Sequence, residues 1–181
     1  AMGDPLRDRR RISDWPSESQ VIDISEDVAS FDKLTAASRG DLEALSEAEL
    51  RAELRDCRVT GRIELRPAGA YGARPGVNGH VEAEVPMTCQ RCLEPFSVRV
   101  AAELDYALVH GSEYEDPQAA GEDTPEAWEL EEPLVRPIDI VDEALLMAMP
   151  LVTRHEDSSG CVEIDADAGG EEMTHPFASL R

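Results

Sequence analysis

The chain has 181 residues, 41% of them hydrophobic and 4% aromatic, which suffices for one globular domain with a mainly aliphatic core. Its formal charge of −22 argues against tight non-specific binding to nucleic acid and suits a basic partner better. No apolar run approaches the roughly 18 residues of a membrane span, and no signal peptide follows the basic start. We therefore expect a soluble, cytoplasmic protein.

The negative charge is concentrated in two segments. Nine acids and no Lys or Arg lie between Ser112 and Glu132, and seven more acids lie unopposed between Glu156 and Glu172. Such segments bury too little apolar surface to order themselves. We expect a flexible acidic loop over residues 112–127 and an acidic tail over residues 156–181. Both runs would ordinarily solvate the protein, and the alternative is that they dock onto a basic partner.

The N-terminal part contains short elements. Residues 1–20 carry several arginines without sustained periodicity, which predicts a flexible basic arm. An edge strand or an extended packing segment is expected over residues 21–24. A first short helix would contain Phe31 and Leu34 and end at Gly40, and a second would follow the capping-box sequence that begins at Ser46.

Three later segments alternate apolar and polar residues with the period of a half-buried strand: 57–66, 77–88 and 95–109. Because short connections join them in sequence, they predict an antiparallel meander. A short strand is also expected at Trp128–Leu130.

The most hydrophobic segment of the chain is Pro137–Pro150. One helical face of this segment is apolar, and it carries Ile138, Val141, Leu145 and Met149. Asp139 is expected as the N-cap, and Pro150 ends the run, so we predict a helix over residues 139–149 that covers the sheet. The predicted fold is therefore α+β, an antiparallel meander packed by this helix and the short N-terminal helices, with a single domain over residues 21–155.

Cys89 and Cys92 have metal-ligand spacing and lie in the turn between the second and third predicted strands. Such a pair can chelate a soft metal, form a redox disulfide or pack as two small apolar groups. A redox role usually needs a helix N-terminus to lower the thiol pKa, whereas strands flank this turn. Arg91 must extend away from the turn, which makes it a candidate for a partner contact.

Arg58, Arg62 and Arg66 lie on one strand face and could meet phosphates, but an ordinary solvated face balanced by Glu64 is the simpler explanation. No serine, cysteine or carboxylate has a recognisable catalytic setting, and the glycines near residue 70 lack the strand-to-helix context of a phosphate loop. We therefore expect no enzymatic activity.

Three motifs in order resemble the YceD family of bacterial large ribosomal RNA subunit accumulation proteins. They are Cys89–Phe96, then Asp142–Val152 followed by His155 and Cys161, and the tail His175–Leu180. The resemblance extends from about Val59 to the end. It implies a role in the synthesis, processing or stability of 23S ribosomal RNA, with pre-ribosomal RNA or a basic large-subunit ribosomal protein as partner, and no known catalytic activity.

Some members of that family carry further cysteines after the hydrophobic helix, which would complete a four-thiolate site. This chain has only Cys161 there, with His155 six residues before it. A zinc site would therefore consist of Cys89, Cys92, His155 and Cys161, and the alternative is that the two cysteines only shape the turn.

The expected contact surface is the turn with the adjoining strand face, and its residues are Arg91, Leu93, Glu94, Phe96, Arg58 and Arg62. The competing functions are a zinc-dependent module and an acidic chaperone for a basic ribosomal protein without RNA contact.

Overall fold

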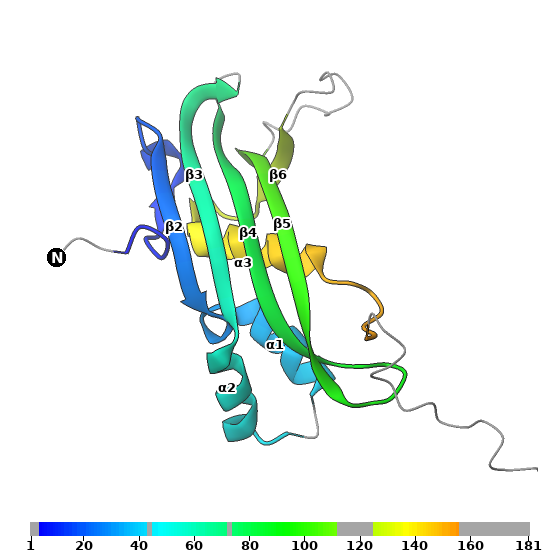
Figure 1. Cartoon of the computed structure of the whole chain (residues 1–181). Helices are drawn as coiled ribbons and strands as arrows, with labels where there is room; N and C mark the ends of the chain where they lie inside the picture. Colours follow the sequence, from blue (N-terminus) through cyan, green and yellow to red (C-terminus); the bar gives the residue numbers. More distant parts are fainter. Residues whose placement is uncertain (1–3, 43–44, 72–73, 112–124, 156–181) are drawn as a thin grey trace, which may run out of the picture.

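A curved five-stranded sheet with helices against one face forms the domain (Figure 1). The computed structural model describes residues 4–42, 45–71, 74–111 and 125–155. The sheet has the order β2-β3-β4-β5-β6, with β2 Gln20–Asp27, β3 Arg58–Tyr71, β4 Arg74–Thr88, β5 Pro95–His110 and β6 Glu126–Leu130. The helices are α1 Asp32–Asp41, α2 Glu47–Asp56 and α3 Pro137–Ala148. The predicted α+β class is confirmed.

The alternating segments form the three long strands of the predicted meander, because each buries every second side chain against the helices. In β3 the buried residues include Val59, Ile63 and Leu65, and in β4 they include Val77 and Val81. Neighbouring strands from β2 to β5 are antiparallel. The expected strand at Trp128 is also present as β6, but it pairs with β5 in parallel.

Helix α3 begins earlier than expected. Pro137 occupies its first turn, where the missing N–H costs nothing, and Arg136 is the N-cap residue. The expectation that Asp139 is the N-cap is therefore wrong. Its carboxylate lies in the first turn and accepts hydrogen bonds from the Arg136 guanidinium at 2.6 and 2.9 Å. Ile140, Val141 and Leu145 of this helix are buried in the core.

The two shorter helices pack at the end of the sheet below α3 in Figure 1. The capping box at Ser46 is confirmed, because its hydroxyl accepts from the Glu49 N–H while the Glu49 carboxylate accepts from the Ser46 N–H. Gly40 does not end the first helix as expected. The helix continues to Asp41, and the buried Leu42 is its C-cap, with its N–H donating to the carbonyl of Ser38.

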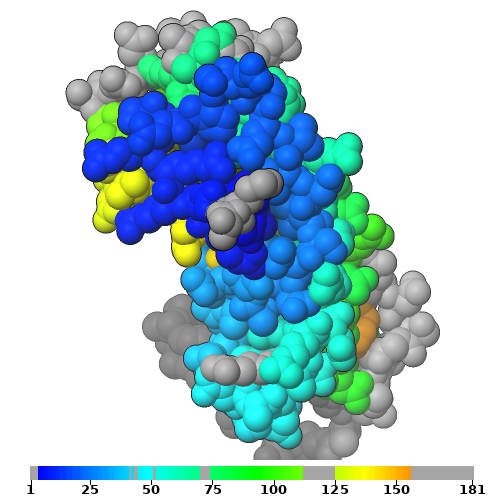
Figure 2. Space-filling view, turned by 90° about the vertical axis from the view of Figure 1, so that its left-hand side faces the viewer, coloured from blue at the N-terminus to red at the C-terminus, as the bar shows by residue number. Residues whose placement is uncertain are grey.

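Residues 4–20 pack onto the domain, contrary to the expected flexible arm. Leu6 and Trp15 are buried in the core, and the N–H of Ile138 donates to the carbonyl of Leu6 at 2.9 Å. Strand β1, Arg10–Arg11, pairs with β7, Leu134–Val135. Figure 2 shows this segment in dark blue beside the yellow segment that contains β7. The domain therefore starts before residue 21.

Two short 3-10 helices complete the described fold, η1 at Ile12–Asp14 and η2 at Val28–Ser30. The predicted acidic loop and acidic tail fall mainly on residues 112–124 and 156–181, which lie outside the described residues, while residues 126 and 127 belong to β6. Within the described residues, no helix combines the length and apolar character that crossing a membrane requires.

Candidate metal centre and contact surface

The turn between β4 and β5 closes on itself through its backbone. The N–H of Cys89 donates to the carbonyl of Glu94 at 2.9 Å, and the N–H of Leu93 donates to the carbonyl of Cys89 at 2.8 Å. Leu93 has a φ of 62°, in the left-handed region that few residues with a side chain adopt. This conformation reverses the chain directly after Cys92.

The segment after α3 runs alongside this turn (Figure 1) and is fixed to it by Thr153. The carbonyl of Thr153 accepts from the N–H of Gln90 at 2.9 Å, and its hydroxyl donates to the carbonyl of Thr88 at 2.7 Å. Thr153 is 3% exposed. Because Thr153 precedes His155 by two residues, these two hydrogen bonds bring the His155 imidazole close to the cysteines.

Cys89, Cys92 and His155 form a compact cluster of ligand atoms, all within 4.8 Å of one another. The Cys92 Sγ lies 3.6 Å from the His155 Nδ1. In a tetrahedral zinc site with Zn–S of about 2.3 Å and Zn–N of about 2.0–2.1 Å, the S···N edge is about 3.6 Å. No disulfide joins Cys89 and Cys92 to each other. The cluster therefore fits a metal that prefers sulfur and imidazole ligands.

The surroundings hold the cluster in place. Cys89 is fully buried, while Cys92 and His155 are half-buried. The ring of Phe96 packs against the imidazole of His155, with centroids 4.4 Å apart. The structure thus brings together three of the four expected ligands, and Cys161 lies outside the described residues.

We call residues 89–96 and 151–155 the tip. Besides the cluster of Cys89, Cys92 and His155, the tip carries exposed apolar side chains: Leu93 is 71% exposed, Leu151 99% and Val152 51%. Arg91 and Glu94 are exposed, whereas Phe96 is half-buried against His155. Exposed apolar side chains gathered near one site are typical of a surface that contacts a partner.

Sequence reasoning missed Thr153, Leu151 and Val152. Leu151 and Val152 end the second motif of the family resemblance, and they are apolar although they directly follow Pro150, which ends the helical pattern. Thr153 has no local signal, because its role depends on hydrogen bonds to a turn more than sixty residues earlier.

The structure does not bring Arg58 and Arg62 to the tip. Both lie on β3, on the sheet face away from the helices, and each meets an acid of β2. The Arg58 guanidinium lies 2.5 Å from the carboxylate of Asp27, and the Arg62 Nε lies 2.6 Å from that of Asp23. Hydrogen bonding to Asp23 raises the pKa of Arg62. Their charges are therefore balanced locally, and their role in binding stays a prediction.

Fold and site together define a small α+β domain that presents a Cys-Cys-His cluster at one end of its sheet. A family model described as "Large ribosomal RNA subunit accumulation protein YceD" matches residues 77–181, more than half of the chain. The chain belongs to the YceD family. The matched region includes β4 from Val77 onward, β5, β6, α3 and the whole tip, whereas β2, β3, α1 and α2 precede it. No curated protein and no solved structure matches the chain.

Proposed function

We propose that this protein is a non-enzymatic ribosome biogenesis factor that supports the synthesis, processing or stability of 23S ribosomal RNA by contacting a partner through its tip. The family description, which names large ribosomal RNA subunit accumulation, supports the process. The observation that carries the contact surface is the exposure of Leu93 on a turn fixed by Thr153 and by the cluster of cysteines and His155.

The rigid presentation of Leu93 favours recognition. A turn that is already ordered loses little conformational freedom on binding, so more of the contact energy appears as affinity. The apolar Leu93, Leu151 and Val152 favour a large-subunit ribosomal protein as the direct partner. The exposed Arg91 and Arg154 at the same tip favour pre-ribosomal RNA as the second candidate, because arginines contact phosphates.

We also propose that the tip binds zinc through Cys89, Cys92 and His155, with Cys161 as the fourth ligand. The separation of 3.6 Å between sulfur and nitrogen supports this choice. The metal would join the turn to the segment after α3, which is a structural role. A site closed by four protein ligands leaves no open position for a substrate, which supports a non-catalytic function.

The test is complementation of cells that lack the native copy. The double variant Arg91→Ala/Leu93→Ser should lower the ratio of large-subunit to small-subunit ribosomal RNA towards the level of the deletion strain. The matched control is Arg55→Ala/Val21→Ser, which removes an exposed arginine of α2 and an apolar side chain of β2 that is 57% exposed. The control should restore the normal ratio.

If a folded Arg91→Ala/Leu93→Ser variant restored the normal ratio of ribosomal RNAs, the tip would not be the contact surface. A photo-crosslinking residue in place of Leu93 identifies the partner. A crosslinked ribosomal protein supports the first candidate, and crosslinked ribosomal RNA supports the second. The variant Arg58→Ala/Arg62→Ala tests the sheet face in the same strain.

A further inference from the structure

We infer that the groove between β6 and α3 is a second contact surface, which takes an extended basic segment of a protein partner. The groove has a volume of about 580 Å³. One wall is β6 with the chain that follows it as far as Val135, and the other wall is α3. None of its lining residues belongs to the tip.

Acidic side chains dominate the rim of this groove. Six carboxylates line it, against the single base Lys33: they are Glu126, Glu129, Glu131, Glu132, Asp139 and Glu143. Three of these acids already have a basic partner, since Glu132 pairs with Arg9, Asp139 with Arg136 and Glu143 with Lys33. Within the described part of the chain, Glu126, Glu129 and Glu131 make no ion pair. These three carboxylates can therefore attract basic groups from outside.

The groove also has an apolar lining. Trp128, Leu130, Ile140 and Met147 contribute to it. Trp128 is held against Tyr106, with ring centroids 4.7 Å apart, so its position is fixed. Met147 is 58% exposed although α3 is the most hydrophobic of the described α-helices. A ligand that combines Lys or Arg with aliphatic side chains would satisfy both the rim and this lining.

The backbone of β6 indicates an extended ligand. β6 pairs with β5 along one side and is the last strand of its sheet, so among the described strands none pairs with its other side. An edge strand offers N–H and carbonyl groups to an added strand, and every second side chain of that strand would face the groove. An extended basic segment thus fits the edge, the rim and the lining at once.

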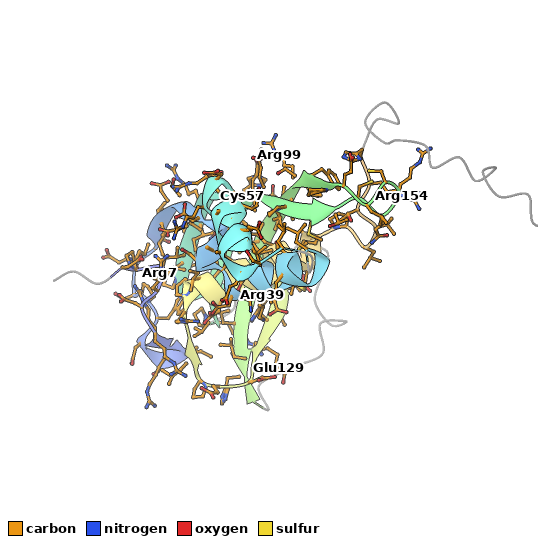
Figure 3. The ribbon with its side chains drawn as sticks, turned by 90° about the horizontal axis from the view of Figure 1, so that it is seen from below. Arg7, Arg39, Cys57, Arg99, Glu129 and Arg154 are labelled. Carbon is orange, nitrogen blue, oxygen red and sulfur yellow. The ribbon has the colours of Figure 1, made fainter. Side chains whose placement is uncertain are left out.

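Other occupants fit the groove less well. RNA would bring phosphates to a rim of carboxylates, and a second copy of this chain would bring a charge of −22. The rim of the groove at Glu129 also lies well apart from Arg154 of the tip, as Figure 3 shows. A partner could therefore occupy the groove while the tip makes its own contact.

The test measures binding of labelled probes to the purified full chain by fluorescence anisotropy. A peptide of alternating Lys and Val should bind, with an affinity that falls as salt rises, whereas the matched peptide of Glu and Val and a short single-stranded RNA should not. The variant Glu129→Lys/Glu131→Lys should weaken binding of the basic peptide about tenfold. Met147→Lys should weaken it as well.

Two matched controls separate the groove from the general acidity of the chain. Glu18→Lys/Glu53→Lys reverses two exposed acids elsewhere, and Val21→Lys changes an apolar side chain as exposed as Met147. Both should leave the affinity unchanged. Hydrogen exchange of the β6 amides should slow when the basic peptide binds.

Three results would overturn the inference: no binding of the basic peptide, an equal loss of affinity in the controls, or binding of the RNA probe in its place. β6 amides that exchange equally fast with and without the peptide would also overturn it. These outcomes are independent of the proposed function, which is tested in cells with variants of Arg91 and Leu93. A groove that fails to bind leaves the role of the tip intact.

Discussion

The carboxylate of Asp142, on α3, accepts a hydrogen bond from the backbone N–H of Leu34, on α1, at 3.1 Å, and another from the N–H of Lys33 at 2.8 Å. These N–H groups lie in the first turn of α1, where no acceptor of the helix itself can reach them. The N-cap residue of α1, Phe31, has no side-chain oxygen that could accept hydrogen bonds from these N–H groups. One helix therefore caps another, and a residue inside the family-matched region holds a helix outside it.

Replacing this capping residue should destabilise the domain. Asp142→Ala removes the acceptor of the N–H groups of Lys33 and Leu34. The loss falls in a buried site, since Asp142 is only 5% exposed. We expect the free energy of unfolding to fall by about 2 kcal/mol, measured by urea denaturation. Asp142→Asn keeps one acceptor oxygen and should lose about half as much.

The control for this prediction is Asp139→Ala, one turn earlier on the same helix. Asp139 is more exposed and pairs only with Arg136 in the described structure, so its removal should cost about 0.5 kcal/mol. If both variants lost the same stability, the capping of α1 by Asp142 would not be the cause.

Strands β3 and β4 approach each other closely at two glycines. A Cβ on Gly79 would lie 2.2 Å from the carbonyl oxygen of Arg62, and a Cβ on Gly61 would lie 2.3 Å from that of His80. Both glycines also have a positive φ, 151° and 156°. Gly79→Ala should therefore lower the free energy of unfolding by about 3 kcal/mol, measured by thermal or urea denaturation.

Gly40 provides the matched control for this substitution. It lies in α1, and a Cβ there would meet nothing within 4 Å. Gly40→Ala should stabilise the domain by about 0.5–1 kcal/mol, because alanine favours the helix and restricts the unfolded chain. A neutral Gly79→Ala variant would show that the two strands can separate without cost.

Much of the sheet could be predicted because burial repeats with a period of two. The alternation in β3, β4 and β5 is visible in the sequence, since every second side chain faces the same core. The parallel pairing of β6 with β5 could not be predicted, because no residue of the strand specifies the direction in which it pairs. Leu6 and Trp15 were missed for a related reason, since two isolated apolar residues among arginines have no period.

The candidate site was likewise predictable only in part. The spacing of Cys89 and Cys92 allows a metal pair but equally a redox disulfide or two packed apolar groups, and the resemblance to the YceD family added His155 to the candidate ligands. The partners of Arg58 and Arg62 could not be foreseen, because the acids that balance them lie on β2, more than thirty residues earlier. Contacts between elements distant in sequence depend on the register of the sheet, which no local pattern specifies.

His80 should make stability depend on pH. The His80 imidazole lies between the carboxylates of Glu82, at 3.1 Å, and Glu103, at 2.5 Å, on the sheet face away from the helices. Hydrogen bonds to Glu82 and Glu103 raise the pKa of His80 above its ordinary value. Because the folded protein then holds this proton more tightly than the unfolded chain, the resulting stability is complete below the ordinary pKa of about 6.5. It is lost as pH rises through the raised value.

The measurement compares the free energy of unfolding of the wild type and His80→Gln at several pH values. The advantage of the wild type should be largest in mildly acidic buffer and should shrink in alkaline buffer. An NMR titration of the His80 ring gives the folded pKa directly. An advantage that grows with pH would contradict the charge-assisted pairing with Glu82 and Glu103.

Metal binding at the tip can be measured directly. Protein purified without a metal-binding tag should contain about one zinc per chain, and chelation should lower its melting temperature, because the metal joins the turn to the segment after α3. Cys92→Ser should lose the metal and no longer respond to the chelator. Cys57→Ser should keep it, since Cys57 is the C-cap residue of α2, outside the cluster.

The fourth ligand is tested by Cys161→Ser, which should weaken zinc binding and change the visible absorption of the cobalt-substituted protein, because thiolate ligands dominate that spectrum. An unchanged spectrum would assign the fourth position to another group. Wild-type protein with no zinc and four free thiols would refute the metal site altogether. The backbone hydrogen bonds of the turn and the two made by Thr153 would then hold Leu93 in place. In that case Thr153→Val should destabilise the tip more than Cys92→Ser does.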